Sequence, residues 1–383
     1  MTAQGMFDAK ALSTCISCGF CLPACPTYAF TGDEAASPRG RIALMRAIDV
    51  GEVDVFDTAA REQGSFCLGC RACEPACPAG VPYGRLIEQL RDAQWTGRRR
   101  PWRIVPLLVF AAHRRLIRAA GLLRRHARHT PAAEFGGSGA AVQSGGSGAA
   151  VQPGEPGDML LLGCFERVLF PAVSRAAADT IPGLRVPREQ GCCGALHAHN
   201  GQSGRGEELA RQLAEQGGRI VSTAGGCAAH LASVIGRDRV ADYSEALLER
   251  GIPVGAVGAI GANGRRARIG LQDSCHLRNG MGTTKAPRDV IGALGDYVEV
   301  PGAGDCCGAA GTYSILRRAD SRRILADKIS ELARLDLDFL VVVNPGCQRQ
   351  MAGALRRARM RTRVVHLAEL VAMAQAEAEA VGP

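Results

Sequence analysis

The sequence CISCGFCLPACP at residues 15–26 and its near repeat CLGCRACEPACP at residues 67–78 decide how the first part of the chain folds. Each run has the spacing Cys-x2-Cys-x2-Cys-x3-Cys-Pro. In this spacing three thiolates surround one iron–sulfur cube and the fourth reaches a second cube. Two such runs predict two [4Fe–4S] clusters. Because such a domain folds around its metal, the same cysteines determine both fold and chemistry.

We expect the two runs to exchange their last cysteines, as this motif does in two-cluster proteins. The first cluster is predicted to have the ligands Cys15, Cys18, Cys21 and Cys77. The second is predicted to have the ligands Cys67, Cys70, Cys73 and Cys25. Structural zinc usually takes two separated Cys-x2-Cys pairs, so two matching four-cysteine runs fit zinc poorly.

The cysteine content also bears on the compartment. The chain has 16 cysteines, and its first 13 residues lack the basic and apolar regions of a signal peptide. Without export, metal binding is favoured over disulfides. No stretch has the roughly 18–20 uncharged apolar residues of a spanning helix. We therefore expect a cytoplasmic protein, with a peripheral position on the inner face of the cell membrane as an open alternative.

Charge is concentrated in one segment. The formal net charge is +9, while residues 98–129 contain ten arginines and no acidic residue. Treating residues 105–125 as one helix places apolar residues on one face and arginines on the other. Such a helix would lie in a membrane interface or pack on protein. No nucleic-acid motif accompanies the arginines, so no nucleic-acid partner is expected. The following GGSGAAVQSGGSGAAVQ at residues 136–152 is typical of a flexible linker.

The second half alternates strand and helix patterns, which favours α/β layers with parallel strands. Short apolar runs, each followed closely by a cysteine, predict strands at 159–162, 219–223, 267–272 and 339–343. Helical patterns cover about 205–217, 286–294, 318–334 and 347–358. The order strand–Cys, Cys-Cys-Gly-Ala, strand–Gly-Cys occurs twice, which indicates a duplication.

Eight further cysteines belong to this repeat. They are Cys164, Cys192, Cys193, Cys227, Cys275, Cys306, Cys307 and Cys347. Cysteines after parallel strand ends converge on the edge where α/β domains bind ligands. A further iron–sulfur cluster or zinc would suit such thiolates, and buried reduced thiols of the core are the alternative. His197, His230 and His276 lie near these cysteines, as ligands, proton relays or structural hydrogen-bonding residues.

The second half resembles the cysteine-rich, or CCG, domain found in heterodisulfide reductases and in glycolate oxidase iron–sulfur subunits. The resemblance rests on CCGALH at 192–197, DSCHL at 273–277, CCGAAGTY at 306–313 and NPGC at 344–347. With the two N-terminal runs, the order is similar to that of glycolate oxidase iron–sulfur subunits along nearly the whole chain. The heterodisulfide reductase motif ends in Cys-x-x-Cys, whereas each copy here has four thiols.

The motifs and the resemblance together imply an α+β multidomain chain. An α-helical ferredoxin-like domain with two [4Fe–4S] clusters precedes a duplicated α/β CCG domain, and the segment between the runs is expected to be helical at residues 42–48. The expected divisions are the ferredoxin-like domain at 1–97, an Arg-rich amphipathic helical segment at 98–135, the linker at 136–157, CCG repeat 1 at 158–265 and CCG repeat 2 at 266–383.

The resemblance implies the iron–sulfur subunit of a glycolate oxidase-like, FAD-dependent 2-hydroxyacid dehydrogenase. FAD would be on a partner flavoprotein subunit, because this chain has no G-x-G-x-x-G fingerprint. Electrons would pass through the two clusters to an acceptor such as quinone. The alternative is a heterodisulfide-reductase-like thiol/disulfide reductase subunit with a catalytic CCG domain. No catalytic side chain is assigned in this chain.

Overall fold

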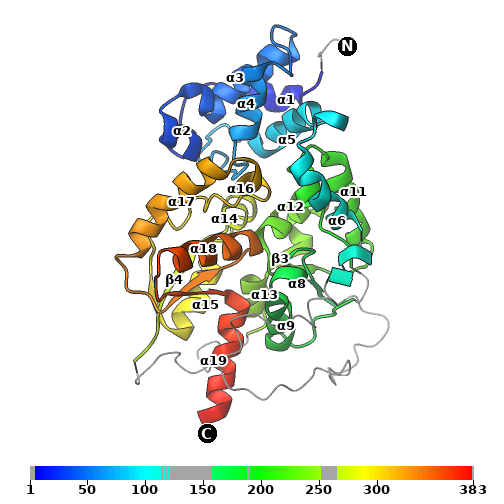
Figure 1. Ribbon diagram of the computed structural model, residues 1–383. Helices are drawn as coiled ribbons and strands as arrows, with labels where there is room; N and C mark the ends of the chain where they lie inside the picture. Colours follow the sequence, from blue (N-terminus) through cyan, green and yellow to red (C-terminus); the bar gives the residue numbers. More distant parts are fainter. Residues whose placement is uncertain are drawn as a thin grey trace.

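The computed structural model describes residues 5–113, 115–117, 119–120, 157–187, 190–251 and 265–381. The predicted linker, apart from residue 157, lies outside the described residues. The N-terminal helical domain lies across one end of two α/β lobes, as Figure 1 shows in blue and cyan above green and orange. The predicted fold class is confirmed: a helical first domain precedes two parallel-sheet units.

The first domain is built from short helices around the two cysteine runs. They are α1 (Ala9–Thr14), α2 (Pro26–Thr31), η1 (Glu34–Ala36), α3 (Pro38–Asp49), α4 (Thr58–Phe66) and α5 (Tyr83–Gln94). Residues 5–113 contain no strand. The Ser37 side chain caps α3 by accepting a hydrogen bond from the Gly40 N–H, and Pro38 supplies the first turn. The helix predicted at residues 42–48 is therefore present and longer than expected.

CCG repeat 1 contains a three-stranded parallel sheet. Its strands are β1 (Met159–Leu161), β2 (Ile220–Ser222) and β3 (Val240–Asp242), in the order β1-β2-β3. Its helices are α8 (Glu166–Leu169), α9 (Pro171–Thr180), α10 (Ala195–Ala198), α11 (Ser203–Ala214), α12 (Gly225–Ile235) and α13 (Tyr243–Glu249), with η4 (Arg237–Arg239) before β3. Every residue of the three strands is buried, as expected for a sheet covered on both faces.

CCG repeat 2 has the same plan with one more strand. The parallel sheet has the order β5-β4-β6-β7, built from β4 (Arg268–Gln272), β5 (Asp296–Val298), β6 (Phe339–Val342) and β7 (Arg363–His366). Its helices are α14 (Cys275–Met281), α15 (Lys285–Leu294), α16 (Tyr313–Leu316), α17 (Arg318–Leu332), α18 (Pro345–Arg357) and α19 (Leu367–Val381). In repeat 2, β5 pairs with β4. At the equivalent place in repeat 1, Arg185 forms a parallel bridge to Met159 of β1, so the duplication extends to strand order.

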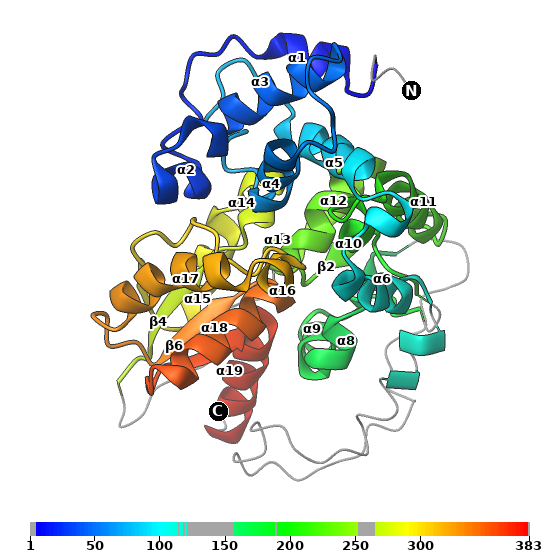
Figure 2. The same ribbon diagram turned by 45° about the horizontal axis from the view of Figure 1, so that its top comes forward.

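The two lobes share one core. Buried residues of β1, β2, β4 and β6 belong to a single hydrophobic cluster. The helices that begin near Cys227 and Cys275, α12 and α14, pack against each other, and α19 crosses to pack on α9 (Figure 2). A Cβ atom at Gly225 would lie 2.5 Å from Ser274 Oγ, so glycine permits this close approach.

The Arg-rich segment differs from its prediction. It begins with η2 (Gly97–Arg99) and η3 (Trp102–Ile104). Helix α6 (Val105–Ala112) then ends, with His113 as its C-cap, so the prediction of one helix over residues 105–125 is wrong. In a continuing helix, the Val109 carbonyl would accept a hydrogen bond from the backbone N–H of His113. Here the same carbonyl is bonded to the His113 ring instead. All of residues 121–135 lie outside the described part. Within that part, no helix is long and apolar enough to cross a membrane.

Candidate metal centres

Two cavities in the first domain bring the eight N-terminal cysteines together in two groups. One is lined by Cys15, Cys18, Cys21 and Cys77, and also by Cys73, which lines both cavities. The other is lined by Cys25, Cys67, Cys70 and Cys73. Each group thus contains the last cysteine of the other run. Four thiols around one cavity fit a [4Fe–4S] cluster, whose four ligands approach from different sides.

The loops of the two runs have the same backbone course. Ser17 and Gly19 in the first run have φ values of 57° and 87°, and Gly69 and Arg71 in the second have 65° and 60°. Left-handed residues at two matching positions turn each chain tightly, so that three cysteines line one cavity. Ser17 and Arg71 are not glycines, so each carries local strain at a site of function.

Positive charge surrounds the second cavity, whose wall includes the almost completely buried Arg41. Arg91 donates hydrogen bonds to the backbone carbonyls of Gly64, Cys67 and His199. Burial alone would raise the pKa of the Cys67 thiol, but Arg41 and Arg91 lower it overall. These guanidinium groups favour thiolate ligands and offset their negative charge in a site with little access to water.

The two cavities differ in exposure. Cys18 is exposed, and its neighbours Ile16 and Phe20 are 70% and 66% exposed. Cys67, Cys70 and Cys73 are all buried. The thiols around the first cavity are therefore nearer the molecular surface than those around the second.

Each CCG repeat gathers its four thiols. In repeat 1, Cys164 Sγ lies 3.4 Å from Cys192 Sγ, and Cys193 hydrogen-bonds both Cys192 and Cys227. In repeat 2, Cys307 Sγ lies 3.3 Å from Cys347 Sγ, and Cys306 hydrogen-bonds both Cys275 and Cys307. The convergence expected from the strand ends is thus present.

Glycine after each Cys-Cys pair is required by space. Gly194 and Gly308 have φ values of 91° and 77°, and Cβ atoms there would lie 2.0 Å from the Gly206 carbonyl oxygen and 2.8 Å from that of Ser321. The Cys-Cys-Gly motif is therefore a tight turn that presents two adjacent thiols.

The thiols of repeat 2 are unequal in acidity. The hydrogen bond between Cys275 and Cys306 lowers the pKa of the Cys275 thiol. The neighbouring His276 also favours the thiolate form of Cys275. The hydrogen bonds with Cys275 and Cys307, and after them burial, raise the pKa of Cys306. Among all the described residues, no group of three or more His, Cys, Asp or Glu side chains is arranged to hold a single metal ion.

The second cysteine run packs against thiols of CCG repeat 2. Cys70 packs with Cys275, Cys306, Leu68 and Tyr313 in one buried cluster. Burial, and after it the negative charge of Cys275, raises the pKa of Cys70. The repeat 1 thiols Cys164, Cys192 and Cys193 belong to the core of the two lobes, which contains no N-terminal cysteine. Repeat 2 therefore adjoins the second cavity directly.

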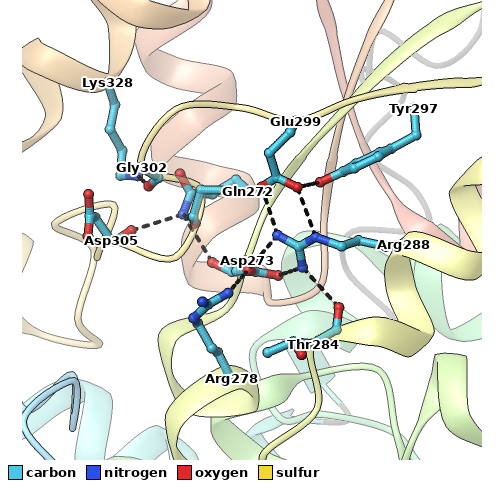
Figure 3. Close-up of polar contacts among 11 residues, drawn as sticks. Gln272, Asp273, Arg278, Thr284, Arg288, Tyr297, Glu299, Gly302, Asp305 and Lys328 are labelled. Atoms are coloured by element: carbon cyan, nitrogen blue, oxygen red, sulfur yellow. Dashed lines mark hydrogen bonds and ion pairs between the residues drawn. The ribbon is translucent and has the colours of Figure 1, made fainter. Parts of the chain in front are cut away.

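A polar network, which sequence reasoning missed, holds the thiols of repeat 2 in place (Figure 3). Asp273, 2% exposed, accepts hydrogen bonds from Arg278 and Arg288, and Arg288 also pairs with Glu299. Gln272 Nε2 donates to the carbonyls of Ala303 and Asp305. The network fixes the loop before Cys306 to the end of β4 before Cys275. Asp273 lies within the quoted motif, but its arginine partners could not be read from it.

The histidines fall into two environments. His197 Nδ1 bonds Gln202 Oε1 at 2.7 Å. His230 and His276 lie near His199, with ring centroids 6.4 and 5.0 Å from its own. Sequence reasoning did not single out His199, whose Nδ1 bonds Glu88 Oε1 at 2.8 Å across the domain boundary. The sequence signal that could have identified His199 is its position two residues after His197.

Comparisons with known proteins agree with this architecture. A family model described as "4Fe-4S dicluster domain" matches residues 11–81, and one described as "Cysteine-rich domain" matches residues 160–232 and 269–352. A "Probable glycolate oxidase iron-sulfur subunit" of Bacillus subtilis (strain 168) is 32% identical over 95% of this chain and 94% of its own length. A "Glycolate oxidase iron-sulfur subunit" of Escherichia coli (strain K12) is 28% identical over 97% and 96%.

A shorter relative aligns with part of the chain. A "Lactate utilization protein A 2" of Bacillus cereus (strain Q1) is 25% identical over 56% of this chain and 96% of its own length. The full-length matches, the dicluster domain and the two cysteine-rich segments together show that the chain belongs to the family of glycolate oxidase iron–sulfur subunits.

Proposed function

We propose that this chain is the electron-transfer subunit of a glycolate oxidase-like 2-hydroxyacid dehydrogenase whose FAD is bound by a partner subunit. The family and the absence of a dinucleotide fingerprint support this assignment. The partner would oxidise glycolate or a similar acid to the 2-oxo acid. Its electrons would then leave through this chain to an acceptor such as quinone.

The observation that carries the proposal is the order of the cysteine sites. The thiols of the first cavity are partly or fully exposed, those of the second are buried, and the second cavity adjoins the thiols of repeat 2 through Cys70 and Cys275. The bound clusters supply one-electron transfer. The exposed side chains of Ile16 and Phe20 offer an apolar contact for the flavoprotein beside the first site.

The proposed ligand sets follow the two cavities. Cys15, Cys18, Cys21 and Cys77 would hold the first cluster, and Cys25, Cys67, Cys70 and Cys73 the second. The four thiols of each CCG repeat, which contact one another, are proposed ligands of a further iron–sulfur cluster or of zinc.

A contact with a membrane surface is a further part of the proposal. Trp102 is 77% exposed, and Val105, Val109 and Leu116 are each at least 40% exposed on the arginine-rich segment. On the other side of this segment, Ile104 and Leu108 pack with Trp95. Exposed apolar side chains among arginines suit an interface with anionic lipid.

Copurification tests the assignment. The chain, produced anaerobically with its natural neighbours, should copurify with a flavoprotein, and glycolate or D-lactate should bleach the iron–sulfur absorbance. A flavin-free preparation whose absorbance no 2-hydroxyacid changes would overturn the proposal. Oxidation of the reduced protein by a heterodisulfide, in the absence of a flavoprotein, would instead support the thiol/disulfide reductase alternative. The observation that favours this alternative is the set of contacts among the CCG thiols.

A further inference from the structure

A cavity lies between the helical domain and the two CCG repeats, and we name it the junction cavity. Its empty space, counted together with the open solvent at its mouth, is about 430 Å³. Its walls combine the cysteine loop of the second run with the segment after Cys306-Cys307. They consist of Ser65, Leu68, Gly69, Arg91, Trp95, His199, His276, Ala310, Gly311, Thr312, Tyr313 and Leu316.

The junction cavity has redox sites on both sides. Leu68 and Tyr313 line it, and both pack against Cys70, Cys275 and Cys306. His276, also in its wall, lies with its Nδ1 atom 3.7 Å from Cys275 Sγ. A molecule in the junction cavity would therefore lie beside the place where the second cluster site adjoins repeat 2.

Three polar atoms in the walls are buried without a hydrogen-bond partner among the described residues. They are the Nε2 atoms of His199 and His276 and the hydroxyl of Tyr313. The other polar side chains that line the cavity are already engaged: Arg91 with three backbone carbonyls, Thr312 with Asn200 and Ser65 with Arg317. Buried polar groups are rarely left unpaired, so these three atoms require a partner.

The three atoms define the chemistry of that partner. Glu88, a hydrogen-bond acceptor, holds His199 Nδ1, and burial lowers the pKa of His199 to about 4, so at neutral pH its Nε2 is a hydrogen-bond acceptor. The unpartnered hydroxyl of Tyr313 can donate a hydrogen bond. The site therefore suits a ligand that can present both carbonyl and hydroxyl groups. The rings of Trp95 and Tyr313 suit a flat ligand.

We propose that the junction cavity binds the ring of a quinone, with the Tyr313 hydroxyl donating to a ring carbonyl and His199 Nε2 accepting from a hydroxyl of the quinol. The inference rests on the proposed function, because the dehydrogenase supplies the electrons. Oxidation of the 2-hydroxyacid on the partner releases two electrons, and these reach the quinone singly. With two protons from solvent they convert both carbonyls of one quinone into the hydroxyls of one quinol.

The two tryptophans of the chain permit a direct binding test. Trp95 lines the junction cavity, whereas Trp102 is exposed, so Trp102→Phe leaves Trp95 as the one tryptophan reporter. The oxidised holoprotein with this change is titrated with menadione, a quinone ring without a lipid tail. We expect saturable quenching of Trp95 fluorescence beyond that of free tryptophan. Quenching that does not saturate would overturn the proposal and leave a water-filled cavity.

Tyr313→Phe is the sharp variant, because it removes only an unpartnered hydroxyl and should leave the melting temperature unchanged or higher. We expect about fivefold weaker menadione binding, the usual effect of one neutral hydrogen bond. Tyr28→Phe, in α2, is the matched control and should bind as the Trp102→Phe protein does. His199→Gln is the second variant and should also weaken binding. Wild-type affinity in both Tyr313→Phe and His199→Gln would contradict the proposal.

A second arm identifies the source of the ring. A long-tailed quinone in phosphatidylcholine vesicles is compared with menadione in water, and quenching by the first as well as the second indicates a membrane quinone. Quenching by menadione alone indicates a soluble quinone, and quenching by neither overturns the site. The titration needs no substrate, so its outcome is independent of the dehydrogenase. If the complex reduces a soluble dye with glycolate but binds no quinone, the proposed function is supported and the quinone site is rejected.

Discussion

The Asn279 side chain donates a hydrogen bond of 2.9 Å to the backbone carbonyl of Cys70, 209 residues earlier in the chain. This bond joins helix α14, which begins at Cys275, to the cysteine loop of the second run. Cys70 and Cys275 belong to the same buried cluster. The relationship distinguishes the two CCG repeats, which are otherwise built on one plan, because it brings the second cluster site to repeat 2.

The crossed ligand sets predict which cluster each substitution damages. Cys77→Ala should remove the cluster whose other ligands are in the first run, because Cys77 lines the first cavity. The matched variant Cys25→Ala should remove the cluster of the second run. Iron content and electron paramagnetic resonance of each reduced cluster give the measurement. Loss of the second-run cluster in Cys77→Ala would show that the sets are not crossed.

The contact of repeat 2 predicts unequal effects of equivalent cysteines. Cys275→Ser should slow the escape of electrons from the second cluster, because Cys275 packs against Cys70. Cys164→Ser, the equivalent change in repeat 1, should leave this step unchanged. Rapid-freeze electron paramagnetic resonance of the complex after mixing with glycolate measures the step. Equal slowing in both variants would argue against a route through repeat 2.

The Asp273 network predicts a loss of stability and of the repeat 2 site. Asp273→Asn should lower the free energy of unfolding by about 2 kcal/mol, below the usual cost of breaking a buried pair because Arg278 and Arg288 are partly exposed. Asp289→Asn, which removes an exposed pair with Lys285, should cost under about 1 kcal/mol. Denaturant unfolding compares them. Equal stability of the two variants would show that the network does not brace the loop.

The buried carboxyl of Asp242 predicts a pH dependence. Burial raises its pKa from 3.8 to about 6. A raised folded-state pKa means that the stability is present below the unfolded pKa and is lost as pH rises through the folded value. Between pH 5 and pH 7 the protein should lose about 1 kcal/mol of stability relative to Asp242→Asn, which keeps a good helix cap. Parallel pH profiles of the two proteins would contradict the shift.

The exposed apolar side chains of the arginine-rich segment predict membrane binding. The purified protein should float with liposomes of anionic lipid, more weakly at high salt and weakly with neutral lipid. Trp102→Ser should reduce flotation, because Trp102 is 77% exposed. Ile16→Ser, which removes a 70% exposed side chain at the first cluster loop, is the control and should float normally. Equal flotation of all three proteins would exclude Trp102 as an anchor.

The sequence by itself determined the elements whose signals are local. Cysteine spacing predicted a two-cluster domain, because three thiolates on one short loop can surround one cube. Buried apolar runs predicted strands β1, β2, β4 and β6, and the repeated motif predicted the duplication that the strand orders confirm. The sequence also identified the cysteines of the CCG sites. The backbone turns with a positive φ after each pair of adjacent cysteines, so a glycine follows the pair and makes the motif recognisable.

Only the tertiary structure decided how these parts meet. Strands β3, β5 and β7 were missed, because they are as short as β1, β2 and β6 and no cysteine follows them closely to mark them. The helix over residues 105–125 was wrong, because a side-chain bond from His113 ends α6, which no hydrophobic pattern records. The contact of Cys70 with Cys275, the pairing of Glu88 with His199 and the junction cavity all join residues far apart in the chain. Such contacts depend on the packing of whole domains, which local spacing does not encode.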